Sequence, residues 1–253
     1  MSKIIRRMGF ISDQEGIMNR YLRESSNWES HLQKTRDFIQ YSFLDTQIES
    51  VAVLGSGWLL DVPIEVLISR FKRVYLVDIH HPAQIRKKTS SMENIQLVEA
   101  DLSGGVVEQL WQVIRKKPVP DAAHLLKEIS FSRPLSHLNF DALISVNLLN
   151  QLDIILCDYL TKHAYFQQEA LQPFRSAIQD FHLQWISETP GCLISDVREI
   201  NEDKEGQSTS KSLLHTYLPD GFRSDAWTWD FDSSGTYRTK TLTRMEVKAL
   251  EWA

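Results

Sequence analysis

The feature that most constrains the fold is the apolar run Ser50–Leu54, which stops abruptly at the turn Gly55-Ser56-Gly57. Such a run is typical of a buried parallel strand that delivers its carboxyl end into a tight turn, with a helix to follow. One glycine permits a backbone angle that other residues avoid, and the next leaves the main chain open to a ligand. The stretch therefore favours a nucleotide-binding corner, although glycine serves geometry alone in many strand-to-helix turns.

Further strand-like runs also end in polar side chains. Arg73–Asp78 reads as a second buried strand that ends in a carboxylate. An acid about 20 positions beyond the glycines is placed to accept hydrogen bonds from ribose hydroxyls. The runs at 95–102 and 140–147 lead to Asp101 and Asn147. Because parallel strands present their carboxyl ends at one edge of a sheet, these side chains predict a ligand crevice in an open α/β sheet.

Two other nucleotide sites fit the turn less well. The dinucleotide pattern Gly-x-Gly-x-x-Gly needs glycine at position 60, where this chain has Leu60. The phosphate-binding loop of nucleotide hydrolases needs a Gly-Lys-Ser/Thr ending, and none follows this strand.

In the glycine turn and the polar strand ends, the chain resembles the class I S-adenosylmethionine-dependent methyltransferases. The resemblance lies in Gly55 and Gly57, in Asp78, in Glu99-Ala100-Asp101 and in the strand that reaches Asn147. It implies an α/β fold with a Rossmann-like, seven-stranded, mostly parallel sheet, an antiparallel C-terminal strand and helices on both faces. It also implies S-adenosylmethionine as the cofactor.

The resemblance assigns roles to individual residues. The glycine turn is implied to lie against the methionine part of the cofactor, Asp78 at the ribose and Asp101 at the adenine. The cofactor-binding residues expected in this way are Gly55, Ser56, Gly57, Asp78, Ile79, Asp101, Leu102 and Asn147. One position departs from the family's Gly-x-Gly-x-Gly: the third glycine is Leu59 here, and we expect leucine to narrow the space beside the cofactor.

Candidate catalytic residues follow the fourth strand. The resemblance implies that Asn147, Asn150 and Gln151 lie next to the transferring methyl group. His182, beside an apolar stripe in the helical region 157–187, and His163 are candidate general bases if they face the cleft. A structural role in the core is the alternative for each histidine. We take Asn147, Gln151 and His182 forward as the catalytic set.

Regions on either side of the glycine turn complete the expected organisation. Residues 1–47 form a helical extension, with a capping box at Ser26–Glu29 and one face formed by Trp28, Leu32 and Ile39. Residues 48–253 form the methyltransferase-like domain, with a helical insertion at about 103–139. Residues 201–210 are polar and rich in breakers, which predicts a mobile loop. Apolar residues alternate with polar ones at 227–231 and again at 245–249, which predicts two closing antiparallel strands.

Composition narrows the partners. The net charge is −5, which argues against a generic nucleic-acid binder, and no DNA partner is expected. Cys157 and Cys192 have apolar neighbours and predict buried thiols; no zinc-type spacing is present, so no metal is expected. No stretch is long enough to span a bilayer, which favours a cytoplasmic protein without a membrane partner.

The sequence thus predicts transfer of a methyl group from S-adenosylmethionine to an acceptor, with a small molecule preferred over protein or RNA. A non-catalytic binding or scaffold protein of the same fold is the alternative, in which Leu59 would mark a lost cofactor site. The sequence identifies neither the acceptor nor the oligomeric state.

Overall fold

The computed structural model describes residues 2–43, 47–115 and 121–253. Its helices are α1 Ser2–Met8, α2 Phe10–Gln40, α3 Ile64–Arg70, α4 Ala83–Thr89, α5 Val106–Arg115, α6 Ala122–Glu128, α7 Ile154–Ala164 and α8 Gln172–Ile186, with short 3₁₀ turns η1 Leu149–Gln151 and η2 Glu169–Leu171. Its strands are β1 Ser50–Leu54, β2 Arg73–Asp78, β3 Ile95–Glu99, β4 Ala142–Val146, β5 Gly191–Glu202, β6 Ser208–Ser212, β7 Arg223–Asp232 and β8 Leu242–Trp252.

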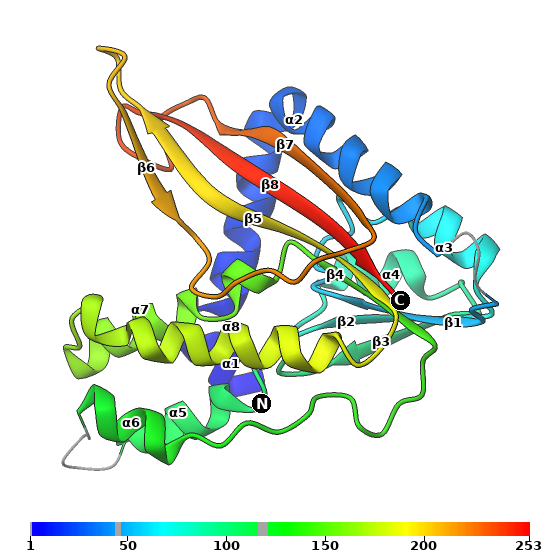
Figure 1. Ribbon diagram of the computed structural model, residues 1–253, viewed down its shortest axis with the longest axis horizontal. Helices are drawn as coiled ribbons and strands as arrows, with labels where there is room; N and C mark the ends of the chain where they lie inside the picture. Colours follow the sequence, from blue (N-terminus) through cyan, green and yellow to red (C-terminus); the bar gives the residue numbers. More distant parts are fainter. Residues whose placement is uncertain (1, 44–46, 116–120) are drawn as a thin grey trace.

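The strands form one mixed sheet, whose main path runs β3-β2-β1-β4-β5-β8-β7 (Figure 1). Strands β1 to β5 are parallel, whereas β8 lies antiparallel between β5 and β7. The expected Rossmann-like sheet with an antiparallel C-terminal strand is therefore confirmed. An eighth strand, β6, is added beside the outer half of β5 and was not predicted.

Helices cover both faces of the sheet, as expected, and successive buried residues of β1 join different core clusters. In β1, Ala52 and Leu54 join a core cluster that draws buried residues from α1, α5, α7 and α8. Val51 and Val53 join a second cluster with residues of α2, α3 and α4. Side chains of successive strand residues point to opposite faces, so each face carries its own core.

The C-terminal half of β5 forms an arm with β6, β7 and β8 that extends beyond the parallel strands (Figure 1). The loop predicted at 201–210 is shorter than expected: residues 203–207 connect two strands, because β5 continues to Glu202 and β6 starts at Ser208. All the side chains of β6 are exposed. A strand exposed in this way has no apolar face to bury, so its polar composition concealed it.

Helix α2 changes direction at Glu24, whose dihedral angles (φ −110°, ψ 17°) are not helical. The predicted capping box at Ser26–Glu29 is wrong: these residues lie inside α2, and its N-cap is Gly9. The Glu24 carboxylate instead accepts hydrogen bonds from the backbone amides of Ser233 (3.1 Å) and Ser234 (3.2 Å), just beyond β7. These bonds tie the bend in α2 to the arm.

The apolar face predicted for this helix is confirmed. Trp28, Leu32 and Ile39 are all buried in the second core cluster, and α2 packs against β7. The N-terminal helices are therefore part of the core and not only an appendage to it.

Two further findings concern the described part of the chain. It contains no helix with the length and apolar character needed to cross a membrane, and no group of three or more His, Cys, Asp or Glu residues suited to a metal ion. Cys157 and Cys192 are free and buried, as predicted, and burial raises the pKa of each thiol to about 12.

Candidate active site

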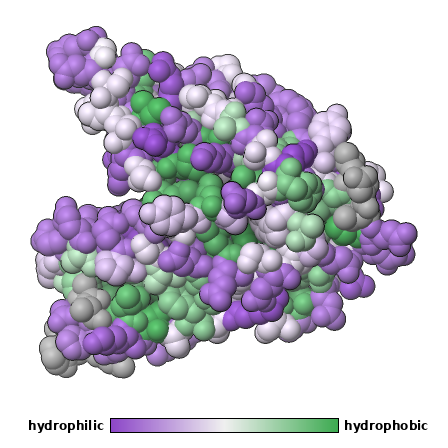
Figure 2. Space-filling model, viewed as in Figure 1, coloured by the Kyte–Doolittle hydropathy of each residue, from purple (hydrophilic) through white to green (hydrophobic). Residues whose placement is uncertain are grey.

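The carboxyl ends of β1, β2 and β4 meet where the strand order reverses between β1 and β4. In open α/β sheets this switch point is the usual place for a ligand. The first half of α2 runs across this side of the sheet (Figure 1). Figure 2 shows a deep notch between the arm and the helices α7 and α8, with apolar residues visible at its base.

The glycine turn is tied to the end of β2. The amides of Gly55 and Ser56 both donate to the carbonyl of Val77, at 3.0 and 3.2 Å. Gly55 has φ +79°, and a Cβ placed there would lie 2.7 Å from the carbonyl oxygen of Val146. Packing against β4 therefore requires glycine at 55, whatever binds nearby.

Gly57 differs from Gly55 in what surrounds it. It has φ +43°, but the atoms nearest to a Cβ placed there are 3.8 and 3.9 Å away. No atom crowds the position that a side chain would take, so the missing side chain leaves an open surface on the turn. This is the property that a ligand-binding glycine needs.

Asp78 anchors the corner. Its Oδ2 accepts a hydrogen bond from the Gly57 amide and its Oδ1 accepts one from the Ile79 amide, each at 2.8 Å. Burial raises the pKa of Asp78, and the hydrogen bond from Gly57 opposes this shift. Since each carboxylate oxygen has two lone pairs, accepting capacity remains for a further donor.

Helix α2 lies over this corner. The side-chain amide of Gln14 donates to the carbonyl of His80 at 3.0 Å and lies 3.5 Å from Oδ1 of Asp78. The indole of Trp58 donates to the carbonyl of Gln14 at 2.7 Å. The glycine turn and α2 thus hold each other directly above the Asp78 carboxylate.

Leu59 occupies the position at which the sequence departs from the family pattern. Its φ is +56°, which explains a preference for glycine there, and its side chain is 7% exposed. It belongs to the second core cluster, with Val62 and Ile64. It also lines a cavity of about 340 Å³ with residues of α2 and α3, so its packing partners lie on the α2 face of the sheet.

Asp101 closes the turn between β3 and α5. Its Oδ1 accepts from the Ser103 amide at 3.0 Å and its Oδ2 from the Val107 amide at 2.9 Å. Burial raises the pKa of Asp101, and the hydrogen bond from the Ser103 hydroxyl opposes this shift. The neighbouring Leu102 is buried. Asp101 is therefore held in place by the start of α5.

A second polar group gathers at the ends of β1, β4 and β5. We call it the Asp61–Asp196 cluster, and its members are His31, Asp61, Asn147, Asn150 and Asp196. The Asn147 amide nitrogen Nδ2 donates to Oδ2 of Asp61 at 2.6 Å and lies 3.3 Å from Nε2 of His31. Asn147 has φ +46°, and its backbone amide donates to the carbonyl of Ile194 within β5, two residues before Asp196.

His31 enters the cluster from α2 and was not predicted. Its Nδ1 accepts a hydrogen bond from Nε1 of Trp227 at 3.1 Å, and its ring stacks on Trp229 with 3.9 Å between centroids. Burial lowers the pKa of His31 to about 3, so the ring is neutral at pH 7. Because Nδ1 accepts, the proton sits on Nε2, so Nε2 does not accept a hydrogen bond from Asn147 Nδ2, which lies 3.3 Å away and donates to Asp61 instead.

The two carboxylates of the cluster share an environment poor in positive charge. Asp196 is 4% exposed. Burial and, to a smaller extent, the Asp61 carboxylate raise its pKa to about 7, against an opposing hydrogen bond from the Asn150 side chain. Burial also raises the pKa of Asp61, opposed by Asn147 and Arg36. Among the described residues, neither carboxylate forms a salt bridge.

Three acceptor atoms of the cluster have no hydrogen-bond partner in the described structure. They are the Oδ1 atoms of Asn147, Asn150 and Asp196, and all three are buried. A buried polar atom without a partner costs about 1–3 kcal/mol, so native proteins rarely retain one without a reason.

The remaining predicted residues lie elsewhere or make weaker contacts. His182 is fully buried under the sheet, with Nε2 3.0 Å from the hydroxyl of Ser145, and burial lowers its pKa to about 4. His163 is exposed on α7 beside the ring of Tyr159. Gln151 is half-buried in η1. The structure thus brings Asn147 and Asn150 together with three residues that the sequence did not single out as catalytic.

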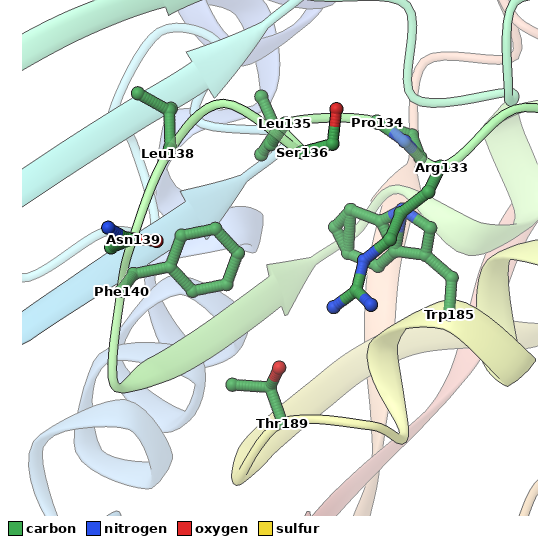
Figure 3. Close-up of a pocket in the computed structure, with 9 residues that line it drawn as sticks. All are labelled: Arg133, Pro134, Leu135, Ser136, Leu138, Asn139, Phe140, Trp185 and Thr189. Carbon is green, nitrogen blue, oxygen red and sulfur yellow. The ribbon is translucent and has the colours of Figure 1, made fainter.

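A separate cavity of about 240 Å³ opens at the opposite edge, where the chain enters β4 and β5 (Figure 3). Arg133, Phe140, Trp185 and Thr189 are among its lining residues. Arg133 already forms an ion pair with Glu188. This cavity shares no residue with the glycine turn or with the Asp61–Asp196 cluster.

Comparisons with known proteins give only distant similarities. No protein-family model matches the sequence, and no curated protein is significantly similar to it. Among solved structures, a DhpI complex with SAH is 8% identical, with 100% of this chain and 99% of that chain covered and a TM-score of 0.39. The 1,6-didemethyltoxoflavin-N1-methyltransferase from Burkholderia thailandensis is 12% identical, covering 95% and 87%, with a TM-score of 0.40.

The plantazolicin methyltransferase BamL, in complex with a substrate analogue and SAH, is also 12% identical. It covers 99% of this chain and 96% of that chain with a TM-score of 0.36. At these identities and TM-scores, the comparisons identify neither a cofactor nor a reaction for this chain.

Proposed function

We propose that the chain binds S-adenosylmethionine at the carboxyl edge of its sheet and transfers the methyl group to a small-molecule acceptor. The observation that carries the proposal is the Asp78 corner: an acid at the end of β2, hydrogen-bonded to the amide of Gly57 at 2.8 Å, beside a glycine with open space around it. This arrangement offers a ribose-binding carboxylate and an approachable backbone at one point of the switch.

The residues present fit this cofactor. Asp78 would accept from the ribose hydroxyls, the turn 55–57 would lie against the methionine part, and Asp101 with Leu102 would border the adenine. The burial of Leu59 in the α2-side core supports the proposal, because it gives that side chain a place outside the expected ligand space. The cofactor supplies an electrophilic methyl group on a sulfonium sulfur, so the protein mainly has to align the acceptor and exclude water.

Asn147 and Asn150 would position the acceptor, since they lie at the end of β4 in the Asp61–Asp196 cluster. We assign His182 to the core and not to catalysis, because its ring is fully buried against Ser145. Gln151, half-buried in η1, is kept as a positioning candidate.

Calorimetric titration with S-adenosylmethionine and S-adenosylhomocysteine tests the proposal. We expect binding of both, and a loss of about 10- to 150-fold in affinity for Asp78→Asn, the range for one lost hydrogen bond to a charged group. Asp225→Asn, which removes an exposed carboxylate from β7, is the matched control and should bind as the unaltered protein does. Absence of binding by folded, unaltered protein would favour the non-catalytic scaffold.

A further inference from the structure

Two kinds of ligand group can be considered for the Asp61–Asp196 cluster, a cation and a neutral hydrogen-bond donor. The cluster holds two carboxylates and the amides of Asn147 and Asn150. Its only histidine, His31, accepts at Nδ1 and is neutral. Arg36 is the cation that acts on Asp61, and its guanidinium is engaged by the carbonyl of Leu60.

The chemistry of the unpartnered atoms indicates which kind of ligand group would satisfy them. Oδ1 of Asp196 and Oδ1 of Asn150 are both acceptors, and both residues are more than nine-tenths buried. The two carboxylates also lack any salt-bridge partner among the described residues. A group that brings several donors and a positive charge would satisfy the orphan oxygens and relieve the repulsion between Asp61 and Asp196.

The cluster is also reachable from the candidate cofactor site. Asp61 lies in the segment that follows the glycine turn, and Asn147 lies at the end of β4, next to β1 in the sheet. Both residues are partly exposed, whereas Asp196 and Asn150 lie deeper. The cluster therefore has an open side at Asp61 and Asn147 and a closed end at Asp196.

We propose that the Asp61–Asp196 cluster binds an alkylammonium group, and that the methyl acceptor is accordingly an amine; the second part rests on the proposed methyl transfer. An ammonium group offers up to three N–H donors and one positive charge. A hydroxyl offers one donor and no charge, and a carboxylate acceptor would be repelled. A divalent metal fits less well, because no group of three metal-ligating side chains is found in the described residues.

The cluster also offers an acceptor for the proton that the ammonium group must lose before its nitrogen can be methylated. The bound ammonium gives one proton to the Asp196 carboxylate, which leaves a lone pair on nitrogen. That pair forms the new nitrogen–carbon bond while the carbon–sulfur bond of the sulfonium breaks and its electron pair stays on sulfur, giving a neutral thioether. Asp196 then releases the proton to water, so that a methylated ammonium and one proton are the products.

The test is an NMR titration of ¹⁵N-labelled protein saturated with S-adenosylhomocysteine, with n-butylammonium as the probe. The indole N–H signals of Trp227 and Trp229, which contact His31, report on the cluster. We expect n-butylammonium to bind at least about tenfold more tightly than n-butanol or butyrate. Equal responses to the amine and the alcohol, or no saturable response to the amine, would overturn the proposal.

Variants sharpen this test. Asp196→Asn should weaken n-butylammonium binding at least about tenfold, whereas Asp225→Asn should leave it unchanged. Asp196→Asn should also raise the thermal unfolding temperature, because it removes a buried charge that no cation pairs with; this separates lost binding from lost folding. Asp61→Asn is the second variant and should weaken amine binding in the same direction. Unchanged amine binding in both variants contradicts the assignment.

A last experiment separates two sources of the ammonium group, since S-adenosylhomocysteine carries an ammonium group of its own. If Asp196→Asn weakens binding of S-adenosylhomocysteine but not of 5′-methylthioadenosine, which lacks the amino-acid part, the cluster serves the cofactor and the amine acceptor is refuted. Unchanged affinity for both supports the acceptor. If the unaltered protein binds neither nucleoside, the proposed function fails, and the amine titration without nucleoside still decides whether the cluster binds ammonium.

Discussion

Two carboxylate sites lie at the same edge of the sheet and are built in opposite ways. Both oxygens of Asp78 accept backbone amides at 2.8 Å, so that side chain is fixed by the fold itself. Asp196 is more deeply buried, sits near a second carboxylate and keeps one oxygen without a partner. Each carboxylate oxygen at the first site already has a partner in the fold, whereas the second site gains its missing interactions only from an added group.

A buried carboxylate that the fold satisfies and one that it leaves without a partner should respond differently to substitution. At Asp78 the burial cost is offset by local amides, so a substitution there should lower stability as well as binding, because it leaves a backbone amide without its acceptor. At Asp196 the cost is borne by the fold, so a substitution there should improve stability as it removes binding. Four substitutions test this contrast, and their expected effects on stability differ in size.

The largest effect is expected for Gly55→Ala. The new methyl group would lie 2.7 Å from the carbonyl oxygen of Val146, at a φ of +79° that alanine avoids. We expect a loss of about 3 kcal/mol or more in the free energy of unfolding, from clash and backbone strain together. Chemical denaturation measures this free energy, and a loss below about 1 kcal/mol would show that β4 shifts away from the new methyl group at little cost.

Asp196→Asn should come next, with the opposite sign. The folded pKa of about 7 lies above the ordinary value of 3.8, so the native protein holds the extra proton and loses stability as pH rises through that window. We expect the variant to be more stable than the unaltered protein at pH 8, by on the order of 2 kcal/mol, and equally stable near pH 4. Denaturation curves at both pH values check this; an equal or lower stability at pH 8 contradicts it.

His31→Gln probes the same cluster with the reverse pH dependence. The folded pKa of about 3 lies below the ordinary value of 6.5, so the unfolded chain binds the proton first and stability falls as pH drops from 6.5 toward 3. The variant should lose about 1–2 kcal/mol at pH 7, through the lost bond from Trp227 and the lost stacking on Trp229. It should also lack that acid slope in a pH series of denaturation curves. An unchanged slope would mean that His31 is not buried neutral.

The smallest effect is expected for Gly57→Ala, the matched partner of Gly55→Ala. A φ of +43° disfavours alanine, but no atom lies within 3.8 Å of the new methyl group. We expect a loss of about 1 kcal/mol in stability together with weaker binding of S-adenosylhomocysteine. Calorimetry and denaturation on the same sample separate the two effects. Full retention of affinity would place the ligand away from the turn.

The sequence predicted the sheet and the Asp78 corner because both depend on local signals. An apolar strand followed by glycine, and a second strand ending in an acid, are visible within Ser50–Asp78. The same local reasoning failed at Ser26–Glu29, where a capping pattern lies inside a helix. There the bend comes from Glu24, which is bonded to residues beyond β7 that are far away in the sequence.

The Asp61–Asp196 cluster escaped prediction because it is assembled from distant segments. Asp61, Asn147 and Asp196 lie far apart in the sequence, and no local pattern links them. His31 did carry a usable signal: it lies between Trp28 and Leu32 on the apolar face of a predicted helix. A titratable residue within such a stripe is buried, but only the structure shows that Trp227 and Trp229 receive it.

Helix α2 touches both sites, with Gln14 above Asp78 and His31 beside Asn147. Deleting one residue between them would rotate one end of the helix by about 100° relative to the other and shift it by about 1.5 Å. Either Gln14 or His31 would then leave its place. The length of helix α2 therefore fixes the spacing between the two sites. Among descendants of this protein, we expect point substitutions along α2 to be tolerated far more often than changes in its length.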